Sequence, residues 1–238
     1  SVLITSNSKE LTIRIKPGTE GPANLRLKHG KTNILTNQVT IDNVNSEPLP
    51  DEAPTVPETI SILEAREAPK GSLVTIEGVI TSQPGLFGGK GFYIQDETAG
   101  IYVFQHEDGF HVGDVVKITA PTTLYNNEIE LTDIISLTKT GTKALLAPKV
   151  VKEVDESNLG QRIKLENVTI DNLAEIENSF EFDVISTDGN KTRVRVDSRT
   201  GITFTQFQEQ FKSGDSIHIS GIASSYKNNF QLKLLTLA

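Results

Sequence analysis

The chain carries the stretch Val112-Gly113-Asp114-Val115-Val116-Lys117-Ile118-Thr119, and the same pattern returns as Ser213-Gly214-Asp215-Ser216-Ile217-His218-Ile219-Ser220. The register then continues without a gap, so that Tyr125 matches Tyr226. The repeat indicates two copies of a β unit of roughly 80–90 residues. A period of that length predicts tandem domains rather than a solenoid.

Each copy shows strand signals in the same order. In the second copy, residues 150–238, Phe204, Phe207 and Phe211 recur at helical spacing between the third and fourth strands. Five strands with a helix in that place are the plan of the OB-fold, a small Greek-key barrel. The sequence therefore predicts an all-β protein with two five-stranded barrels. In the first copy, residues 59–149, we expect the strands at residues 73–82, 92–96, 101–105, 114–120 and 129–137.

The chain ahead of the repeat has a different character. In residues 1–44, Leu11, Ile13 and Ile15 alternate with polar residues, which predicts short strands. We expect a small β module or the tail of a β-sandwich, because the segment is short for a core of its own. Residues 45–58 combine four prolines with acidic residues, which predicts an extended, semi-rigid linker.

Composition excludes several kinds of site. The net charge is −8, with 31 acidic against 23 basic residues, and this argues against a general polyanion binder. The chain has no cysteine, so disulfides and thiolate-ligated zinc are excluded. No apolar run is long enough to span a bilayer. Because the chain starts at Ser1 and has no methionine, we expect it to be a piece of a longer protein whose remainder holds any activity.

Three runs of the first copy carry a family resemblance: Gly71-Ser72-Leu73-Val74-Thr75-Ile76-Glu77-Gly78-Val79-Ile80-Thr81, Gly91-Phe92-Tyr93-Ile94-Gln95-Asp96-Glu97-Thr98-Ala99-Gly100-Ile101-Tyr102-Val103 and Val112-Gly113-Asp114-Val115-Val116-Lys117-Ile118. They resemble the OB-fold modules of secreted bacterial nucleases, nucleotidases and phosphoesterases, which precede a catalytic domain. The resemblance covers residues 60–140, and residues 155–238 through the repeat. It implies an extracellular or cell-wall location and an accessory, non-catalytic role. No catalytic signature is present, and no cofactor is expected.

The usual binding surface of an OB barrel is the face of strands two and three. If Ile94 and its apolar neighbours point into the first barrel, four side chains point out and form an aromatic face on which bases or sugar rings can stack. The alternative is that this face packs against the neighbouring domain. Tyr125 and Tyr226, at matching positions, join the candidates. The four side chains of the aromatic face are Tyr93, Gln95, Tyr102 and Phe104.

One strand of the second copy carries a basic stripe. Arg193 and Arg195 alternate with valines and should share one strand face, which makes them candidates for phosphate contacts. The alternative is cross-strand pairing with Glu181 and Asp183, whose spacing is complementary.

The first copy offers only scattered polar candidates. Lys90 and Lys117 could contact phosphates, and the alternative is a solvated surface. The loop of residues 106–111 holds metal-ligand residue types. It lacks a distant second pair, so no metal site is predicted.

Together these features predict a non-catalytic region that binds single-stranded nucleic acid or a nucleotide weakly, beside a catalytic domain of the same polypeptide. The alternatives are a structural or protein-interaction spacer of a cell-surface protein, or a carbohydrate-binding module that uses the same aromatic face. Salt separates these readings, because only nucleic-acid binding should fall steeply as ionic strength rises.

Overall fold

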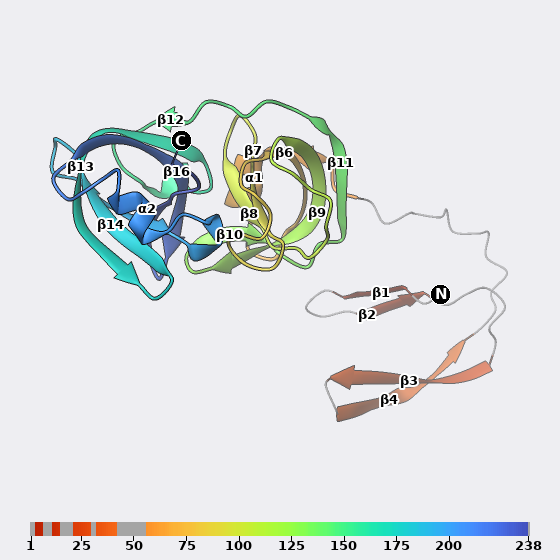
Figure 1. The fold of residues 1–238 in the computed structure, drawn as a ribbon. Coiled ribbons are helices and arrows are strands. Elements are labelled where there is room, and N and C mark those ends of the chain that lie inside the picture. Colours follow the sequence, from red (N-terminus) through yellow and green to blue (C-terminus); the bar gives the residue numbers. More distant parts are fainter. Residues whose placement is uncertain (1–2, 7–10, 15–20, 30–31, 42–55, 238) are drawn as a thin grey trace. The chain divides into compact units, whose positions relative to one another are not determined.

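The structure is a computed structural model, and it describes residues 3–6, 11–14, 21–29, 32–41 and 56–237 (Figure 1). The chain divides into two compact units, Ser1–Thr55 and Val56–Ala238. Most of the predicted linker, residues 45–58, lies outside the described residues.

The first unit contains two two-stranded antiparallel sheets. A short strand is present at Leu11 and Ile13, as predicted. One sheet pairs β1 (Leu3–Ser6) with β2 (Leu11–Arg14), and the other pairs β3 (Gly21–His29) with β4 (Thr32–Ile41).

The second unit begins with a closed barrel. Its five strands pair in the order β6-β7-β8-β10-β9, and β9 returns to β6 to close the ring. The β8–β10 pair is parallel, while the other pairs of the ring are antiparallel. The elements are β5 (Thr59–Ile60), α1 (Ile62–Glu67), β6 (Leu73–Ile80), β7 (Phe92–Gln95), β8 (Gly100–Val103), β9 (Asp114–Tyr125), β10 (Glu128–Leu131) and β11 (Ser136–Thr142).

The following barrel repeats this strand order. Its strands pair as β13-β14-β15-β17-β16, β16 closes onto β13, and the β15–β17 pair is again the parallel one. The predicted fold of two five-stranded Greek-key barrels is therefore confirmed. The elements are β12 (Lys149–Val150), η1 (Glu156–Asn158), β13 (Arg162–Ile176), β14 (Ser179–Ile185), β15 (Lys191–Val196), η2 (Ser198–Thr200), α2 (Phe204–Gln208), β16 (Ser216–Tyr226) and β17 (Asn229–Lys233).

The repeated Gly-Asp pair forms the same turn in both barrels. Gly113 and Gly214 have φ of 91° and 93°, a left-handed conformation that glycine adopts at little cost. Each N–H donates to a carbonyl of the first strand of its barrel, at 2.9 Å in the first and 2.8 Å in the second. The next residue, Asp114 or Asp215, accepts a hydrogen bond from the backbone N–H three residues before it. The matching sequence thus sets the entry into the fourth strand of each barrel.

The predicted fifth strand of the first barrel, residues 129–137, is wrong as a single element. The chain leaves the ring after Leu131 and passes through Asp133, whose φ is 50°. It then returns as β11, which pairs with β9 outside the ring. Aspartate tolerates this left-handed conformation, so the turn was hidden inside an apparently continuous apolar pattern.

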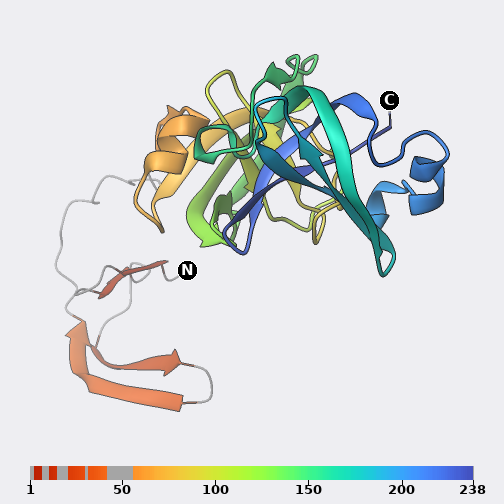
Figure 2. The ribbon, with the colours of Figure 1, turned by 90° about the vertical axis from the view of Figure 1, so that its left-hand side faces the viewer.

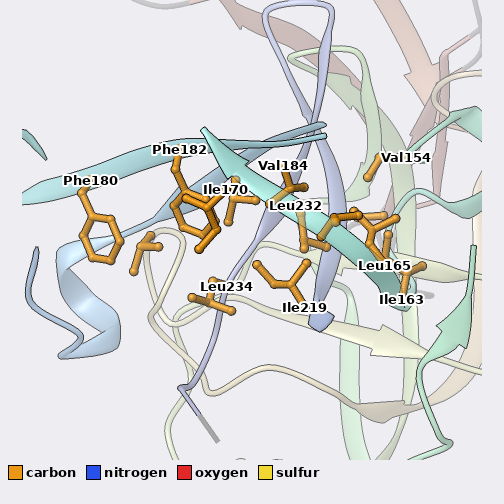
Figure 3. Packing of buried hydrophobic residues seen from close by; sticks show 14 of the residues in the cluster. Val154, Ile163, Leu165, Ile170, Phe180, Phe182, Val184, Ile219, Leu232 and Leu234 are labelled. Atoms are coloured by element: carbon orange, nitrogen blue, oxygen red, sulfur yellow. The ribbon is translucent and has the colours of Figure 1, made fainter. Parts of the chain in front are cut away.

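The predicted helix of the second barrel is confirmed. Helix α2 starts at a capping box made by Thr203 and Gln206, and Phe207 is buried in the barrel core, with Phe204 and Phe211 packed against it. The Phe207 ring centroid lies 5.1 Å from that of Phe180 and 4.8 Å from that of Phe182. Figure 3 shows Phe180 and Phe182 together with aliphatic side chains of this core, such as Ile170 and Val184.

The first barrel has no helix in the matching place between β8 and β9. Instead α1 precedes β6 and buries Ile62 and Ala65 in the core of the first barrel. No helix in the described part of the chain is long and apolar enough to cross a membrane.

Candidate functional site

The two barrels lie side by side (Figure 1, Figure 2). At one point, the backbone of one barrel directly contacts the backbone of the other. Gly100 of β8 and Gly160, just before β13, approach so closely that a Cβ atom on either residue would overlap the carbonyl group of the other. Beside them, the backbone N–H of Arg162 donates to Gln95 Oε1 over 2.9 Å. Gln95 is therefore buried as a contact between the barrels.

The aromatic face is mostly covered by this contact. Tyr93 and Tyr102 point out of the first barrel, as predicted, but they are only 1% and 6% exposed. They form a small cluster with Ile222 of the second barrel, and Phe87 packs against it. The expectation that bases stack directly on these two tyrosines does not fit this arrangement, because the second barrel occupies the space. Phe104 stays exposed, with its ring against His106 at 5.0 Å.

A partly buried lysine of the second barrel lies among these rings. Lys233 Nζ donates to the Tyr93 hydroxyl oxygen over 2.7 Å and lies 4.5 Å from the Phe87 ring centroid and 4.9 Å from that of Tyr93. Burial lowers the pKa of Lys233, while nearby Glu128 and Glu130 oppose that shift. Ring faces and carboxylates together stabilise the ammonium group.

Two glutamates of β10 complete this environment. Glu128 is buried, and its Oε2 accepts from the backbone N–H of Ser225 over 3.1 Å, which ties the barrels together again. Its Oε1 has no hydrogen-bond partner among the described residues. Burial raises the pKa of Glu128. Burial, together with the neighbouring Glu128, raises the pKa of the half-buried Glu130 to about 7.

These groups surround a cavity of about 430 Å³, which we call the junction cavity. Both barrels contribute to its wall. Tyr125 and Tyr226, from the matching hairpins, line it and are 63% and 49% exposed. Of the ten residues proposed from the sequence, the junction cavity brings together Tyr93, Tyr102, Tyr125, Arg195 and Tyr226.

A second hollow of about 760 Å³, the face cavity, adjoins the first. Phe104 and His106 line it on the first barrel. The two cavities share part of their walls, so they form neighbouring sites along one surface. The shared residues are Phe87, Tyr102, Tyr125 and Glu130.

The basic stripe is paired rather than free. Arg193 binds Glu181 Oε2 at 2.7 Å and Asp183 Oδ1 at 2.6 Å, and Arg195 binds Glu181 Oε1 at 2.9 Å. This is the cross-strand pairing that the sequence left open as the alternative to phosphate contacts, and the register of β14 against β15 sets these acidic side chains directly opposite. Arg195 still reaches the junction cavity.

The two candidate lysines lie elsewhere. Lys90 forms an ion pair with Asp108 in the neighbouring loop. Lys117 is exposed on β9 and lines neither cavity. In the described part of the chain, no group of three or more His, Asp or Glu side chains could hold a metal ion.

Sequence reasoning missed Glu128, Glu130 and Lys233. The alternation of Glu128 and Glu130 around Ile129, in a strand of a small barrel, was a usable signal for an outward acidic pair. For Lys233 the sequence carries no such signal, because its burial depends on the other barrel.

The raised pKa of Glu130 predicts a measurable pH dependence of stability. The folded protein holds the Glu130 proton up to about pH 7 and the unfolded chain only to about 4.5. Stability from this group is therefore present below that window and is lost as pH rises through it. Relative to the wild type, Glu130→Gln should gain on the order of 1–2 kcal/mol between about pH 5 and pH 8, after allowance for solvent screening of a half-exposed group.

Urea denaturation of both proteins at the two pH values measures this gain. Glu175→Gln, which removes an exposed carboxyl group on β13, controls for the loss of one negative charge. An equal difference between wild type and Glu130→Gln at both pH values would contradict the prediction.

Comparison with known proteins gives structural likeness only. No protein-family model matches the chain, and no curated protein matches its sequence. A structure of fission yeast Pot1 with single-stranded DNA has 11% identity and a TM-score of 0.36, and the match covers 88% of this chain and 86% of that one. A murine DNA-binding protein bound to double-stranded DNA has 11% identity and a TM-score of 0.33, covering 68% of this chain and 93% of that one.

A third solved structure, the hypothetical protein ygiW from E. coli, has 20% identity and a TM-score of 0.29, covering 35% of this chain and 89% of that one. The assignment of the chain to the OB-fold class rests on its strand order, which both barrels show in full.

Proposed function

We propose that residues 56–238 are a non-catalytic region that binds a short segment of single-stranded nucleic acid, or a nucleotide, at the junction of the two barrels. The observation that carries this proposal is the pair Tyr125 and Tyr226. These tyrosines come from the matching hairpins of the two barrels, are more exposed than the other tyrosines, and line one cavity.

Ring geometry supports a base as the ligand. Exposed tyrosine rings that line a cavity can stack on a planar base, and such stacking is worth ~1–3 kcal/mol per base whatever the base is. The junction cavity, at about 430 Å³, falls within the size range of small-molecule sites. The face cavity continues past the shared wall, which suits a chain of more than one unit.

Charge argues for weak binding. In the junction cavity, Arg195 and Arg199 are paired with the acidic residues Glu181 and Asp197. Lys233 is partly buried, and its ammonium group donates to the Tyr93 hydroxyl. Few cations are therefore left to neutralise phosphates, and the −8 net charge opposes the approach of a polyanion. Affinity should therefore be modest and should come mainly from stacking on the tyrosine rings.

Titration of fluorescently labelled oligothymidine at low ionic strength tests the proposal. Tyr125→Ala and Tyr226→Ala should each weaken binding roughly 5- to 100-fold, because each removes one stacking ring. Phe230→Ala is the matched control, since Phe230 is an exposed ring on the same hairpin as Tyr226 but lines neither cavity. No binding by the wild type, or equal losses in all three variants, would overturn the proposal.

The second candidate function is a rigid spacer. The closed Gly100–Gly160 contact and the buried tyrosine cluster favour it, because they fix the two barrels against each other without any ligand. In that case the titration shows no binding at any salt concentration. An oligosaccharide that binds equally well at low and high salt would instead support the carbohydrate-binding alternative.

We also propose that the chain is an accessory region of a larger secreted nuclease or phosphoesterase, on the basis of the resemblance over residues 60–140. Antibody detection in culture medium and in cells tests this proposal. A secreted species longer than this chain is expected, and a species confined to the cells would contradict it.

A further inference from the structure

We propose that Glu130 selects among bases in the junction cavity by accepting hydrogen bonds from their N–H edges, with guanine preferred. This inference rests on the proposed function and adds to it the class of base that is bound. The Glu130 carboxyl group is a specificity-determining group for a ligand that stacks on Tyr125 and Tyr226.

Strand β10 presents both carboxyl groups to the cavity. Ile129 packs against the core of the first barrel, so Glu128 and Glu130 lie on the opposite, outward face of the strand. Both line the junction cavity, and Glu130 also lines the face cavity. In the ladder Glu130 is the partner of Tyr102, which places it beside the ring cluster and on the wall that the two cavities share.

One acceptor on this wall is left unused by the protein. No hydrogen bond or ion pair engages the Glu130 carboxyl group within residues 56–237, and it is only half-buried. Glu128, by contrast, is enclosed by the protein, and its Oε2 accepts from the backbone N–H of Ser225. The ammonium group of Lys233 is held by the Tyr93 hydroxyl. A partly desolvated acceptor without a donor is costly, so a ligand that brings N–H groups to Glu130 relieves that cost.

Base chemistry ranks the ligands. Guanine presents two adjacent donors, N1–H and the N2 amino group, which match the two oxygens of one carboxylate. Cytosine and adenine each present one amino group, and glutamate accepts from such groups. Thymine presents one N–H between two carbonyl oxygens, which a carboxylate repels. We therefore expect the order guanine, then cytosine and adenine, then thymine.

Ionisation of the Glu130 carboxyl group should change the size of this preference. The ionised carboxylate is the better acceptor, so discrimination should be larger at about pH 8 than at about pH 6. Comparison of wild type with Glu130→Gln at each pH isolates Glu130 from the other titratable and charged groups around it. Those groups are Glu128, Lys233, Tyr93 and Tyr102, the paired Glu181, Arg195, Asp197 and Arg199, and His106, Glu107 and Asp133 of the face cavity.

The experiment titrates labelled five-nucleotide oligothymidines in which only the central base is varied. At about pH 8 the wild type should bind the central-guanine oligonucleotide roughly tenfold more tightly than the all-thymine one. Glu130→Gln should remove most of that difference, because the amide no longer offers two acceptor oxygens to guanine or repels the carbonyl oxygens of thymine. Glu175→Gln, an exposed carboxyl change on β13 outside both cavities, should behave as wild type.

The outcomes separate the two proposals. Equal wild-type affinity for all four oligonucleotides overturns the selection by Glu130 and leaves the binding function standing. A guanine preference that persists in Glu130→Gln also overturns it. Failure of the wild type to bind any of the four overturns both proposals. A preference lost in Glu130→Gln and kept in Glu175→Gln supports the inference.

Discussion

Phe207→Ala is expected to lower the free energy of unfolding by about 3–5 kcal/mol, the range for truncating a fully buried phenylalanine. Phe207 is the ring at which helix α2 joins the core of the second barrel, in contact with Phe180, Phe182 and Phe211. Its removal leaves a cavity between α2 and β14 that the closed barrel cannot collapse to fill. Urea denaturation followed by circular dichroism measures the loss.

The control for this change is Phe230→Ala. Phe230 is exposed on β17, so truncating it removes a ring of the same size without opening a core cavity, and the loss should stay within about 0.5 kcal/mol. Equal losses in the two variants would show that α2 does not close the second barrel through Phe207.

Gly160→Ala is expected to destabilise the protein by about 2–6 kcal/mol and to loosen the two barrels from each other. Two effects combine. Gly160 has a φ of +79°, which strains any residue with a side chain. In addition, the new methyl group would overlap the backbone of Gly100, and a backbone held in a barrel strand cannot move aside.

Gly201→Ala separates these two effects. Gly201 has a φ of +78°, and a Cβ atom there would meet nothing within 4 Å, so this variant carries the same strain without the overlap. Urea denaturation gives the stability difference, and tyrosine fluorescence reports the environment of Tyr93 and Tyr102 at the junction. If Gly160→Ala costs no more than Gly201→Ala and leaves the fluorescence unchanged, the barrels do not depend on this contact.

The fold was accessible from the sequence because its signals are local. The Gly113-Asp114 and Gly214-Asp215 turns, the strand alternation and the phenylalanine spacing of α2 each depend on neighbouring residues. The error at Asp133 is also local in origin, since one left-handed residue within an apolar pattern ended β10 and started β11 on another partner.

The site was accessible only in part. Alternation correctly placed Tyr93 and Tyr102 outside the first core, and the repeat correctly paired Tyr125 with Tyr226. Neither signal could show that the second barrel covers Tyr93 and Tyr102, or that Tyr125 and Tyr226 stay exposed. The spacing of Arg193 and Asp183 left an ion pair and a phosphate contact both open, and strand register placed the two side chains opposite each other as an ion pair.

By itself, then, the sequence of this protein determined two barrels, their strand order and the side of each strand that faces its own core, because these follow from periodicity and turn chemistry over a few residues. Tertiary structure alone decided what lies between the barrels. The Gly100–Gly160 contact, the partly buried Lys233 and the buried Glu128 bound to Ser225 arise from residues far apart in the chain. The pKa shifts of Lys233 and Glu128 follow from burial. That burial depends on how the surface of one barrel covers the other and excludes water.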